Sequence, residues 1–197
     1  MKTLKEYIIE GILDIEDNME NLTEESLIED FIKENYEIKH GNLQFKKKGD
    51  KYIVSTKGIV LVKNNNITAL TNGLFEWGEV KSFYCVGCTS LQSLKGAPKK
   101  AGWNFSCVEC TSLQSLKGAP KEVGGYFYCY YCASLKDLKG STEKVGMSFD
   151  CNNCTSLKSL EGAPKEVGWD FYCSDCGKKF TEEDVRAVCN VKDRITV

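Results

Sequence analysis

The segment from Phe105 to Pro120, FSCVECTSLQSLKGAP, is one copy of a repeat that fills the middle of this 197-residue chain. It contains two cysteines separated by two residues, Cys107 and Cys110, followed by a pair of leucines, a glycine and a proline. The cysteine pair returns every 22 residues, at positions 85/88, 107/110, 129/132, 151/154 and 173/176. A fixed period of this length is typical of solenoid proteins, in which each repeat forms one coil of a stack.

The repeat unit reads F-x-C-x-x-C-x-S-L-x-x-L-x-G-x-P, and a phenylalanine precedes the first cysteine by two in all five copies. Because side chains alternate along a strand, Phe-x-Cys predicts a short strand with both side chains on the inside. The glycine and proline positions predict turns. One such unit cannot bury a core alone, whereas stacked copies can. We therefore predict an α+β, mainly β, solenoid with one parallel sheet.

A further, degenerate copy lies upstream, and its internal spacing is that of the other copies: Ile59, Leu61, Asn64, Ile67 and Leu70. Leu61 takes the place of the first cysteine and Asn64 that of the second. The first position therefore behaves as a core position. The second is expected to carry a polar side chain that bonds turn backbone inside the coil.

The pattern L-x-L-x-x-N/C-x-x-L, together with the run C-x-S-L-x-x-L-x-G-x-P, resembles leucine-rich repeats of the bacterial, BspA-like type. The unit is also similar to short SL-x-G-A-P-K-x-V-G repeats of bacterial and phage proteins. The resemblance covers about residues 57–177. It implies a leucine-rich-repeat solenoid that binds other molecules, and it leaves the bound molecule open. Cysteine at both the strand and the turn position departs from the usual pattern.

The two ends are predicted to cap the stack, with residues 1–56 and 178–197 outside the solenoid of 57–177. At the N-terminal end we expect amphipathic helices, one around residues 3–17 and one that follows Thr23 as its N-cap, and then a β-hairpin with a Lys-Gly-Asp turn. At the other end we expect a helix that starts at Thr181 and seals the last coil. Cys189 is interpreted as a packed residue of this helix, and the final RITV as a short strand.

Composition and charge favour a cytoplasmic protein that binds another protein. No stretch approaches the ~20 apolar residues of a membrane span, and the first residues lack the features of a signal peptide. Residues 1–35 have a net charge of −8, and the rest of the chain has +6. The acidic part is the solvated face of helices or a surface for a basic partner. The overall net charge of −2 argues against nucleic acid as the partner, although the lysines of the turns form a weak basic stripe.

The repeated Cys-x-x-Cys pairs allow a second interpretation, because two such pairs are typical of a zinc site. Against zinc, the spacing follows from the stacking of coils alone, and Leu61 and Asn64 fill the same positions without thiolates. Buried structural thiols are the favoured interpretation, with no cofactor and no metal. Catalysis is not expected, since a cysteine nucleophile needs a nearby base and the only histidine, His40, lies outside the five cysteine-containing copies.

The predicted function is therefore that of a non-enzymatic protein-interaction module, with a phage-encoded inhibitor of a host defence protein and a zinc-binding module as alternatives. If Phe and Cys face inward, the alternate positions, including Ser82, Ser106, Val108 and Ser148, face outward and vary between coils. Tyrosine is favoured at interfaces, but exposed strands also take aromatic residues for cross-strand packing. The acidic N-terminal helices are a second possible surface. The candidate partner-binding residues are Tyr84, Tyr126, Tyr128, Tyr130, Asp150, Asp170 and Tyr172.

Overall fold

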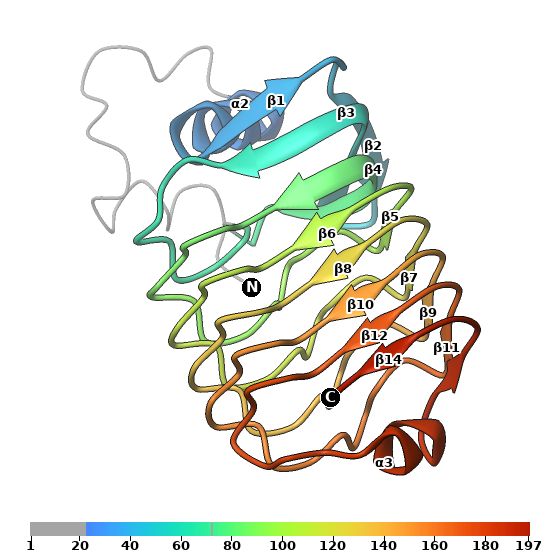
Figure 1. The fold of residues 1–197 in the computed structure, drawn as a ribbon. Helices are drawn as coiled ribbons and strands as arrows, with labels where there is room; N and C mark the ends of the chain where they lie inside the picture. The colour runs from blue at the N-terminus through green and yellow to red at the C-terminus, as the bar shows by residue number, and fades with distance from the viewer. Residues whose placement is uncertain (1–22, 72) are drawn as a thin grey trace.

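A computed structural model describes residues 23–71 and 73–197 of the chain. These residues form a parallel-sheet β-solenoid of about seven turns with a spacing of 22 residues (Figure 1). The solenoid begins beneath a helix and a set of long strands, and it ends beside a short helix at the C-terminal end (Figure 1). The predicted mainly-β solenoid is thus confirmed. The expected helix around residues 3–17 lies outside the described residues.

The N-terminal end contains the predicted second helix and hairpin. Helix α2 (Glu24–Asn35) starts after Thr23, whose hydroxyl accepts the N–H of Ser26. Strand β1 (Tyr36–Lys39) follows, and β2 (Gln44–Lys48) and β3 (Lys51–Val62) form the hairpin. Both β1 and β2 pair antiparallel with β3, which then pairs in parallel with β4 (Phe75–Tyr84). Because β3 crosses residues 56 and 57, the proposed domain boundary falls within one strand and stays a prediction.

Each coil of the solenoid contributes two short parallel strands, one to each of two ladders, whereas one strand per coil was expected. β4 is long enough to start both ladders, which are joined through it into one sheet (Figure 1). One ladder follows the phenylalanines: β6 (Phe105–Ser106), β8 (Phe127–Tyr128), β10 (Phe149–Asp150), β12 (Phe171–Tyr172) and β14 (Ile195–Thr196). The other lies just upstream in each coil: β5 (Lys100–Ala101), β7 (Glu122–Val123), β9 (Lys144–Val145), β11 (Glu166–Val167) and β13 (Asn190–Val191).

A column of glycines lies between the two ladders. Each coil bends at its glycine, where there is no room for a side chain. A Cβ atom added at Gly124, Gly146 or Gly168 would lie 2.1 Å from the carbonyl oxygen of the glycine in the preceding coil. Real Cβ atoms essentially never approach backbone this closely. The repeated Val-Gly of the sequence is therefore the end of a second strand followed by a corner.

The interior of the stack is built from ladders of identical side chains. The five phenylalanines are fully buried, and neighbouring rings lie 5.1–5.8 Å apart between centroids. The paired leucines of the repeats are also buried. Stacking of aromatic rings at this separation adds about 0.5–1.5 kcal/mol per pair to the burial of apolar area.

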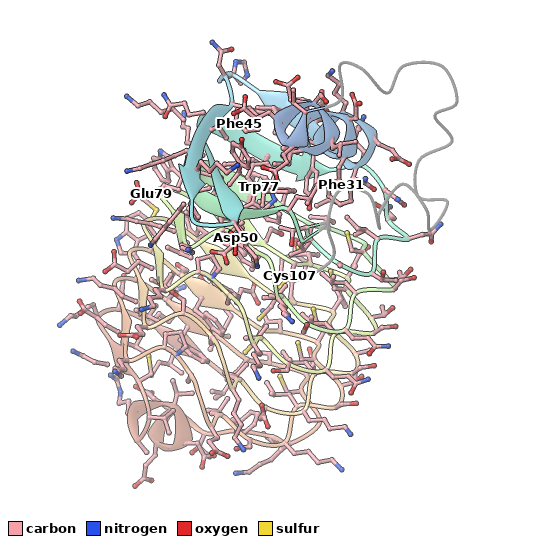
Figure 2. The ribbon with its side chains drawn as sticks, turned by 180° about the vertical axis from the view of Figure 1, so that it is seen from behind. Phe31, Phe45, Asp50, Trp77, Glu79 and Cys107 are labelled. Atoms are coloured by element: carbon pink, nitrogen blue, oxygen red, sulfur yellow. The ribbon has the colours of Figure 1, made fainter. Side chains whose placement is uncertain are left out.

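The cysteines form the next interior ladder, and their thiols hydrogen-bond to backbone carbonyls of neighbouring coils. The Sγ of Cys132 lies 3.1 Å from the carbonyl oxygen of Cys107, and those of Cys110 and Cys154 make the same contact one coil away at 3.0 and 3.2 Å. The second cysteine thus bonds a backbone carbonyl of the preceding coil, whereas a bond to turn backbone inside its own coil was expected. Sulfur atoms lie within the outline of the stack, as Cys107 does in Figure 2.

The degenerate upstream copy is shifted by one residue from the predicted alignment. Val60, not Ile59, pairs with Phe83, and Leu61 pairs with Tyr84. Val60 is buried and Leu61 is only half-buried, so Leu61 does not occupy a core cysteine position. Asn64 is exposed and donates from its side-chain amide to that of Asn35, 3.0 Å away, at the end of α2. Inward and outward positions still alternate along β3. The connection from this strand to the following turn is one residue shorter than in the other copies.

At the C-terminal end, α3 (Glu182–Arg186) begins after Thr181, and the hydroxyl of Thr181 accepts the N–H of Asp184. The final strand is present as β14. Cys189 is buried, but it follows the helix instead of belonging to it, in the turn that leads to β13. Strands β13 and β14 each add a rung to one ladder, so the chain completes a last coil there.

Candidate binding surface

The outward face of the phenylalanine ladder aligns residues of successive coils in columns. Parallel pairing in register places Tyr84, Ser106, Tyr128, Asp150 and Tyr172 in one column. The adjacent positions carry three more tyrosines in a single coil, Tyr126, Tyr130 and Tyr131. The third coil therefore differs from its neighbours in being tyrosine-rich across its whole outward side.

Four of these tyrosines and one tryptophan make a continuous series of ring contacts. Tyr126 and Tyr128 stack with their centroids 5.4 Å apart, Tyr128 and Tyr130 meet at 6.0 Å, and Tyr130 and Tyr131 at 5.6 Å. Trp169 meets the edge of Tyr126 at 6.3 Å from two coils away. We call these residues the aromatic run: Tyr126, Tyr128, Tyr130, Tyr131 and Trp169. Tyr131 and Trp169 are about half exposed, at 50% and 48%.

Several residues that were expected to face solvent on this surface are buried. Ser106 is 3% exposed, since it stands in the column between the larger side chains Tyr84 and Tyr128. Val108, Ser82 and Ser148 are also buried. The predicted alternation of inward and outward residues determines only the side of the sheet to which a side chain points. Larger neighbours on that side decide whether water reaches it.

Asp170 is held by the solenoid backbone and by a tyrosine. Its Oδ1 accepts the N–H of Arg194 at 3.1 Å, and its Oδ2 accepts the hydroxyl of Tyr172 at 2.8 Å. Ser82 and Ser148 accept the N–H of the next coil in the same column. Asp170 therefore has a role in stacking the coils, and it fixes the ring of Tyr172. The carboxylate also raises the pKa of the Tyr172 hydroxyl by accepting its proton in a hydrogen bond.

Burial raises the pKa of two groups at the centre of this face. Desolvation raises the pKa of Tyr128 to about 12, further above the neutral range in which a tyrosine hydroxyl is protonated in any case. Desolvation also raises the pKa of Asp150, whose Oδ1 accepts the N–H of Asn152 at 2.9 Å. A carboxylate that is costly to ionise in the folded protein is a common feature of functional sites.

The structure thus brings Tyr126, Tyr128 and Tyr130 into direct contact, with Asp150 and Tyr172 in register beside them. Tyr84 lies at the other end of the column, where its hydroxyl accepts the side-chain amide of Asn104 at 3.1 Å. Trp103, which shares the repeat position of Trp169, is 42% exposed. Whether the predicted residues bind a partner stays a prediction.

Sequence reasoning missed Tyr131, although a signal for it exists in the repeat. The equivalent positions in the other copies hold Gly87, Glu109, Asn153 and Asp175, and all five have a positive φ. Tyr131 has a φ of 60°. Glycine, asparagine and aspartate are the residues that tolerate this conformation, whereas a bulky side chain there is uncommon. A tyrosine at this position is thus a local departure from what the backbone favours.

An open groove follows the line of these turns, next to the aromatic run. It has a volume of about 620 Å³, and it is lined by Asn65, Gly87, Thr89, Glu109, Thr111, Tyr131, Ala133, Asn153 and Thr155. Tyr131 belongs to both features, so the run and the groove form one continuous surface across the third coil. The exposed lining of the groove is mainly apolar, with threonine hydroxyls and the carboxylate of Glu109 as its polar groups.

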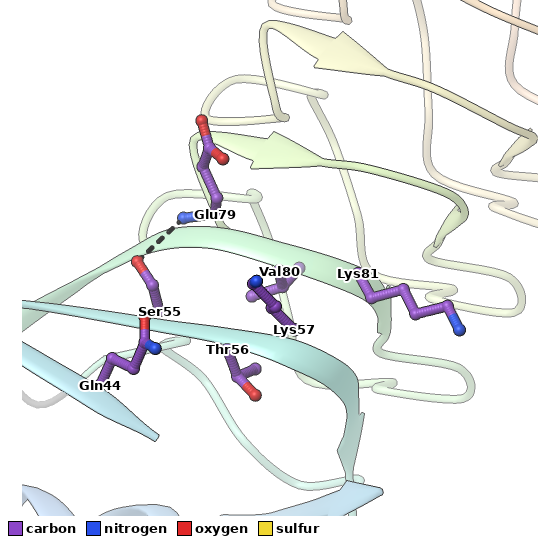
Figure 3. A pocket seen from close by; sticks show the side chains of 7 residues that line it. All are labelled: Gln44, Ser55, Thr56, Lys57, Glu79, Val80 and Lys81. Carbon is purple, nitrogen blue, oxygen red and sulfur yellow. Dashed lines mark hydrogen bonds between the residues drawn. The ribbon is translucent and has the colours of Figure 1, made fainter. Parts of the chain in front are cut away.

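A second hollow, of about 450 Å³, lies where β3 and β4 part at two irregularities in their pairing (Figure 3). The N–H of Glu79 donates to the hydroxyl of Ser55 across it, and the side chain of Lys81 extends away from that of Lys57 (Figure 3). The polar side chains therefore do not converge on one point, which makes this hollow a weaker candidate than the aromatic run.

The thiols of the solenoid hydrogen-bond to backbone carbonyls. All eleven cysteines are without disulfides, and the two thiols of a coil bond carbonyls of neighbouring coils on opposite sides, as do Cys151 with Tyr172 and Cys154 with Cys129. Burial and thiol neighbours raise the pKa of Cys129 and Cys151. In residues 23–71 and 73–197, no three His, Cys, Asp or Glu side chains are placed to hold a metal ion.

The lysines of the turns are partly neutralised by acids on the same side of the solenoid. The second ladder alternates in charge, with Lys100 and Lys144 each 3.5 Å from a glutamate of the following coil. Lys139 lies 2.8 Å from Glu161. Such exposed pairs contribute little stability, but they reduce the positive potential that nucleic acid would require.

Comparison with protein families, with curated proteins and with solved structures finds no match to this chain. Within the described residues, neither helix has the length and apolar character required to cross a lipid bilayer.

Proposed function

We propose that this protein is a non-enzymatic interaction module that binds a protein partner through the aromatic run. The observation that carries the proposal is the concentration of four contacting tyrosines in one coil of a scaffold whose interior hardly varies. Large, fairly rigid side chains with a polar tip are the ones that dominate protein interfaces. Cross-strand packing alone accounts for tyrosines within a sheet, but not for Tyr131, which lies in a turn and is half exposed.

The proposal includes a relationship to leucine-rich-repeat proteins of the bacterial and phage type. The 22-residue period and the buried leucine pairs support it. The hydrogen bond from the second cysteine to a backbone carbonyl of the preceding coil supports it further. A cytoplasmic location belongs to the same proposal, because eleven unpaired thiols suit a reducing compartment.

A second candidate surface is the acidic face of α2, which would suit an inhibitor that engages a basic surface of a host defence protein. Glu25, Glu29, Asp30 and Glu34 of this helix are exposed. This surface lies at the N-terminal end of the solenoid, away from the aromatic run (Figure 1). Variants of the two surfaces therefore separate the two candidates.

The test is capture of a partner from the native cell, followed by affinity measurement with the purified partner. We expect the double variant Tyr128→Ala, Tyr130→Ala to lose at least 100-fold in affinity, since two hot-spot side chains contribute about 2 kcal/mol or more each. Trp103→Ala is the matched control, because it removes an exposed aromatic residue outside the aromatic run. Equal affinity of the double variant and the control would place the interface elsewhere. Loss only on charge reversal of Glu25 and Glu29 would favour α2.

Metal analysis of the purified protein tests the zinc alternative. We expect no stoichiometric zinc after dialysis, because the thiols donate hydrogen bonds to backbone carbonyls. Zinc that remains bound at one equivalent or more, together with loss of the fold on chelation, would contradict the role assigned here to the cysteines.

A further inference from the structure

The groove beside the aromatic run is lined by two columns of turn residues, and its volume of about 620 Å³ is that of a small-molecule site. One column holds residues with a positive φ: Gly87, Glu109, Tyr131 and Asn153. The other lies two residues further along each coil: Thr89, Thr111, Ala133 and Thr155. Asn65 lies at the upstream end, where a Cβ atom added at Gly87 would be 3.6 Å from its amide nitrogen. The groove thus crosses successive coils instead of following one of them.

The polar side chains of the groove are not used by the fold. On the neighbouring sheet face, Asn104 and Asn152 each accept an N–H of the following coil, at 3.1 and 2.6 Å. In the groove, the side chains of Asn65, Glu109 and Asn153 make no hydrogen bond or ion pair with any residue of 23–71 and 73–197, and neither do the three threonine hydroxyls. Amides, hydroxyls and one carboxylate along this groove therefore remain available to a ligand.

The main-chain N–H groups of the turns are already paired. The N–H of Glu109 donates to the carbonyl of Tyr130 at 3.1 Å, and the N–H of Tyr131 donates to that of Asn152 at 3.0 Å. Gly87 and Asn153 make the same bond to the following coil. An extended peptide that is recognised by strand addition needs unpaired main-chain groups. A ligand in this groove is therefore recognised by side chains.

The third coil departs from the repeat twice, and both departures line the groove. Tyr131 stands where the other copies have glycine, glutamate, asparagine or aspartate, and Ala133 replaces the threonine of three other copies. The ring of Tyr131 is 50% exposed. It meets the ring of Tyr130 at 5.6 Å with an angle of 74° between the planes, so the two rings do not stack face to face. A half-exposed ring and a methyl group thus lie between groups that can form hydrogen bonds.

We propose that this groove binds a neutral oligosaccharide, with a pyranose ring packed against Tyr131 and Ala133 and its hydroxyls bonded to Glu109, Asn153 and the threonines. A pyranose has an apolar face of C–H groups, which suits the negative face of an aromatic ring, and a rim of hydroxyls that both donate and accept. The lining contains no lysine, arginine or histidine, so an acidic sugar or a phosphate finds no counter-charge there. The site goes beyond the proposed protein interface, with which it shares Tyr131.

The test is an array of immobilised oligosaccharides of glucose, galactose, mannose and N-acetylglucosamine, with uronic-acid and sulfated counterparts, probed with the full chain. We expect binding to neutral members and weaker binding to their acidic counterparts. The neutral trisaccharide that binds most tightly is then titrated in solution and followed by NMR. The amides of Glu109, Tyr131 and Asn153 should shift, whereas the amide of Asn190, on the second ladder, should not.

Two variants with matched controls test the assigned side chains. Tyr131→Asn removes the ring and keeps a residue that tolerates the positive φ, so it should weaken sugar binding about ten-fold, whereas Tyr131→Phe should retain it. Glu109→Gln should weaken binding several-fold, because hydrogen bonds to a charged acceptor are stronger than those to a neutral one. Asp175→Asn, at the equivalent turn position outside the groove, should have no effect. Circular dichroism confirms that the variants fold.

Absence of binding to every neutral oligosaccharide overturns the inference, and so does equal binding by the wild-type chain and Tyr131→Asn. If no sugar binds while Tyr128→Ala, Tyr130→Ala still loses the captured protein partner, the inference fails and the proposed function stands. If Tyr131→Asn and Glu109→Gln weaken only the capture of that partner, the groove is part of the protein interface and the inference also fails.

Discussion

The inside and the outside of each coil follow different rules. Inside, the same residue types recur from coil to coil, and each touches its own copy above and below, as the phenylalanine rings do at about 5 Å. Outside, Tyr84, Ser106, Tyr128 and Asp150 share one column and have little in common. The stacking geometry thus constrains the interior to near-identity. It leaves the face free to differ, so differences on the face are where a specific function is expected.

Adjacent aromatic residues test this contrast most strongly. Phe127→Ala should lower the free energy of unfolding by about 3–5 kcal/mol, because it leaves a cavity in the middle of the ring ladder. Tyr128→Ala, one residue on, should lower it by only about 1 kcal/mol, since the ring loses neighbours on one side of the sheet. Urea unfolding followed by circular dichroism measures both. Similar losses for the two variants would mean that the face is as much a part of the core as the interior.

The second cysteine position tests whether the interior needs a hydrogen-bond donor or only an apolar filler. If the thiol of Cys132 is needed as a donor to the Cys107 carbonyl, Cys132→Ser should be more stable than Cys132→Val, by about 1 kcal/mol. Serine has a hydroxyl donor of similar size. Valine has no donor and leaves the Cys107 carbonyl without the side-chain hydrogen bond from position 132. The midpoint of thermal unfolding ranks the two variants. Valine as the more stable replacement would show that the cysteines act as small apolar residues.

Much of the interior could be predicted because the repeat itself reports it. A phenylalanine, two cysteines and two leucines at a constant 22-residue step identify the buried positions without further information. The second ladder was not predicted, because a two-residue strand such as Glu122–Val123 is too short to show alternation. The shift at Val60 was not predicted either, since the loss of one residue in a connection leaves most of the spacing intact.

The candidate surface could be predicted only in part. Alternation identified Tyr126, Tyr128 and Tyr130, which lie at successive outward positions of one coil and touch each other. It gave the wrong exposure for Ser106 and Val108, because burial on a face depends on the size of neighbours from other coils. It also passed over Tyr131, a bulky residue at a repeat position whose positive φ favours glycine, asparagine or aspartate.

Tyr131 offers a smaller effect of the opposite sign. Tyr131→Asn should stabilise the protein by about 0.5–1 kcal/mol, because asparagine tolerates the left-handed conformation that tyrosine disfavours. Asn153→Tyr, at the same position one coil on, is the matched control and should destabilise by a similar amount. Thermal unfolding of both variants gives the comparison. A stabilised Tyr131→Asn variant with weaker partner binding would indicate that this tyrosine is kept for function; a destabilised one would make it a packing residue.

The smallest effect concerns the charge of Asp150 and depends on pH. Burial raises the pKa of this carboxyl in the folded protein above its value of about 3.9 in the unfolded chain. A group with a raised folded pKa stabilises the fold fully below the unfolded pKa, and this contribution is lost as the pH rises through the folded pKa. Asp150→Asn, which keeps an oxygen for the N–H of Asn152, should therefore raise the unfolding temperature at pH 7. The gain should shrink as the pH approaches about 4.

Asp170 and Arg194 are charged groups on this part of the face, and both are present in the wild-type chain and in Asp150→Asn, so the difference between the two proteins belongs to Asp150. Asp175→Asn is the control for the loss of one exposed acid. A wild-type chain more stable than Asp150→Asn at pH 7 would show that the carboxylate is already satisfied within the fold. A gain at pH 7 would show that the isolated protein holds an unsatisfied charge on its face.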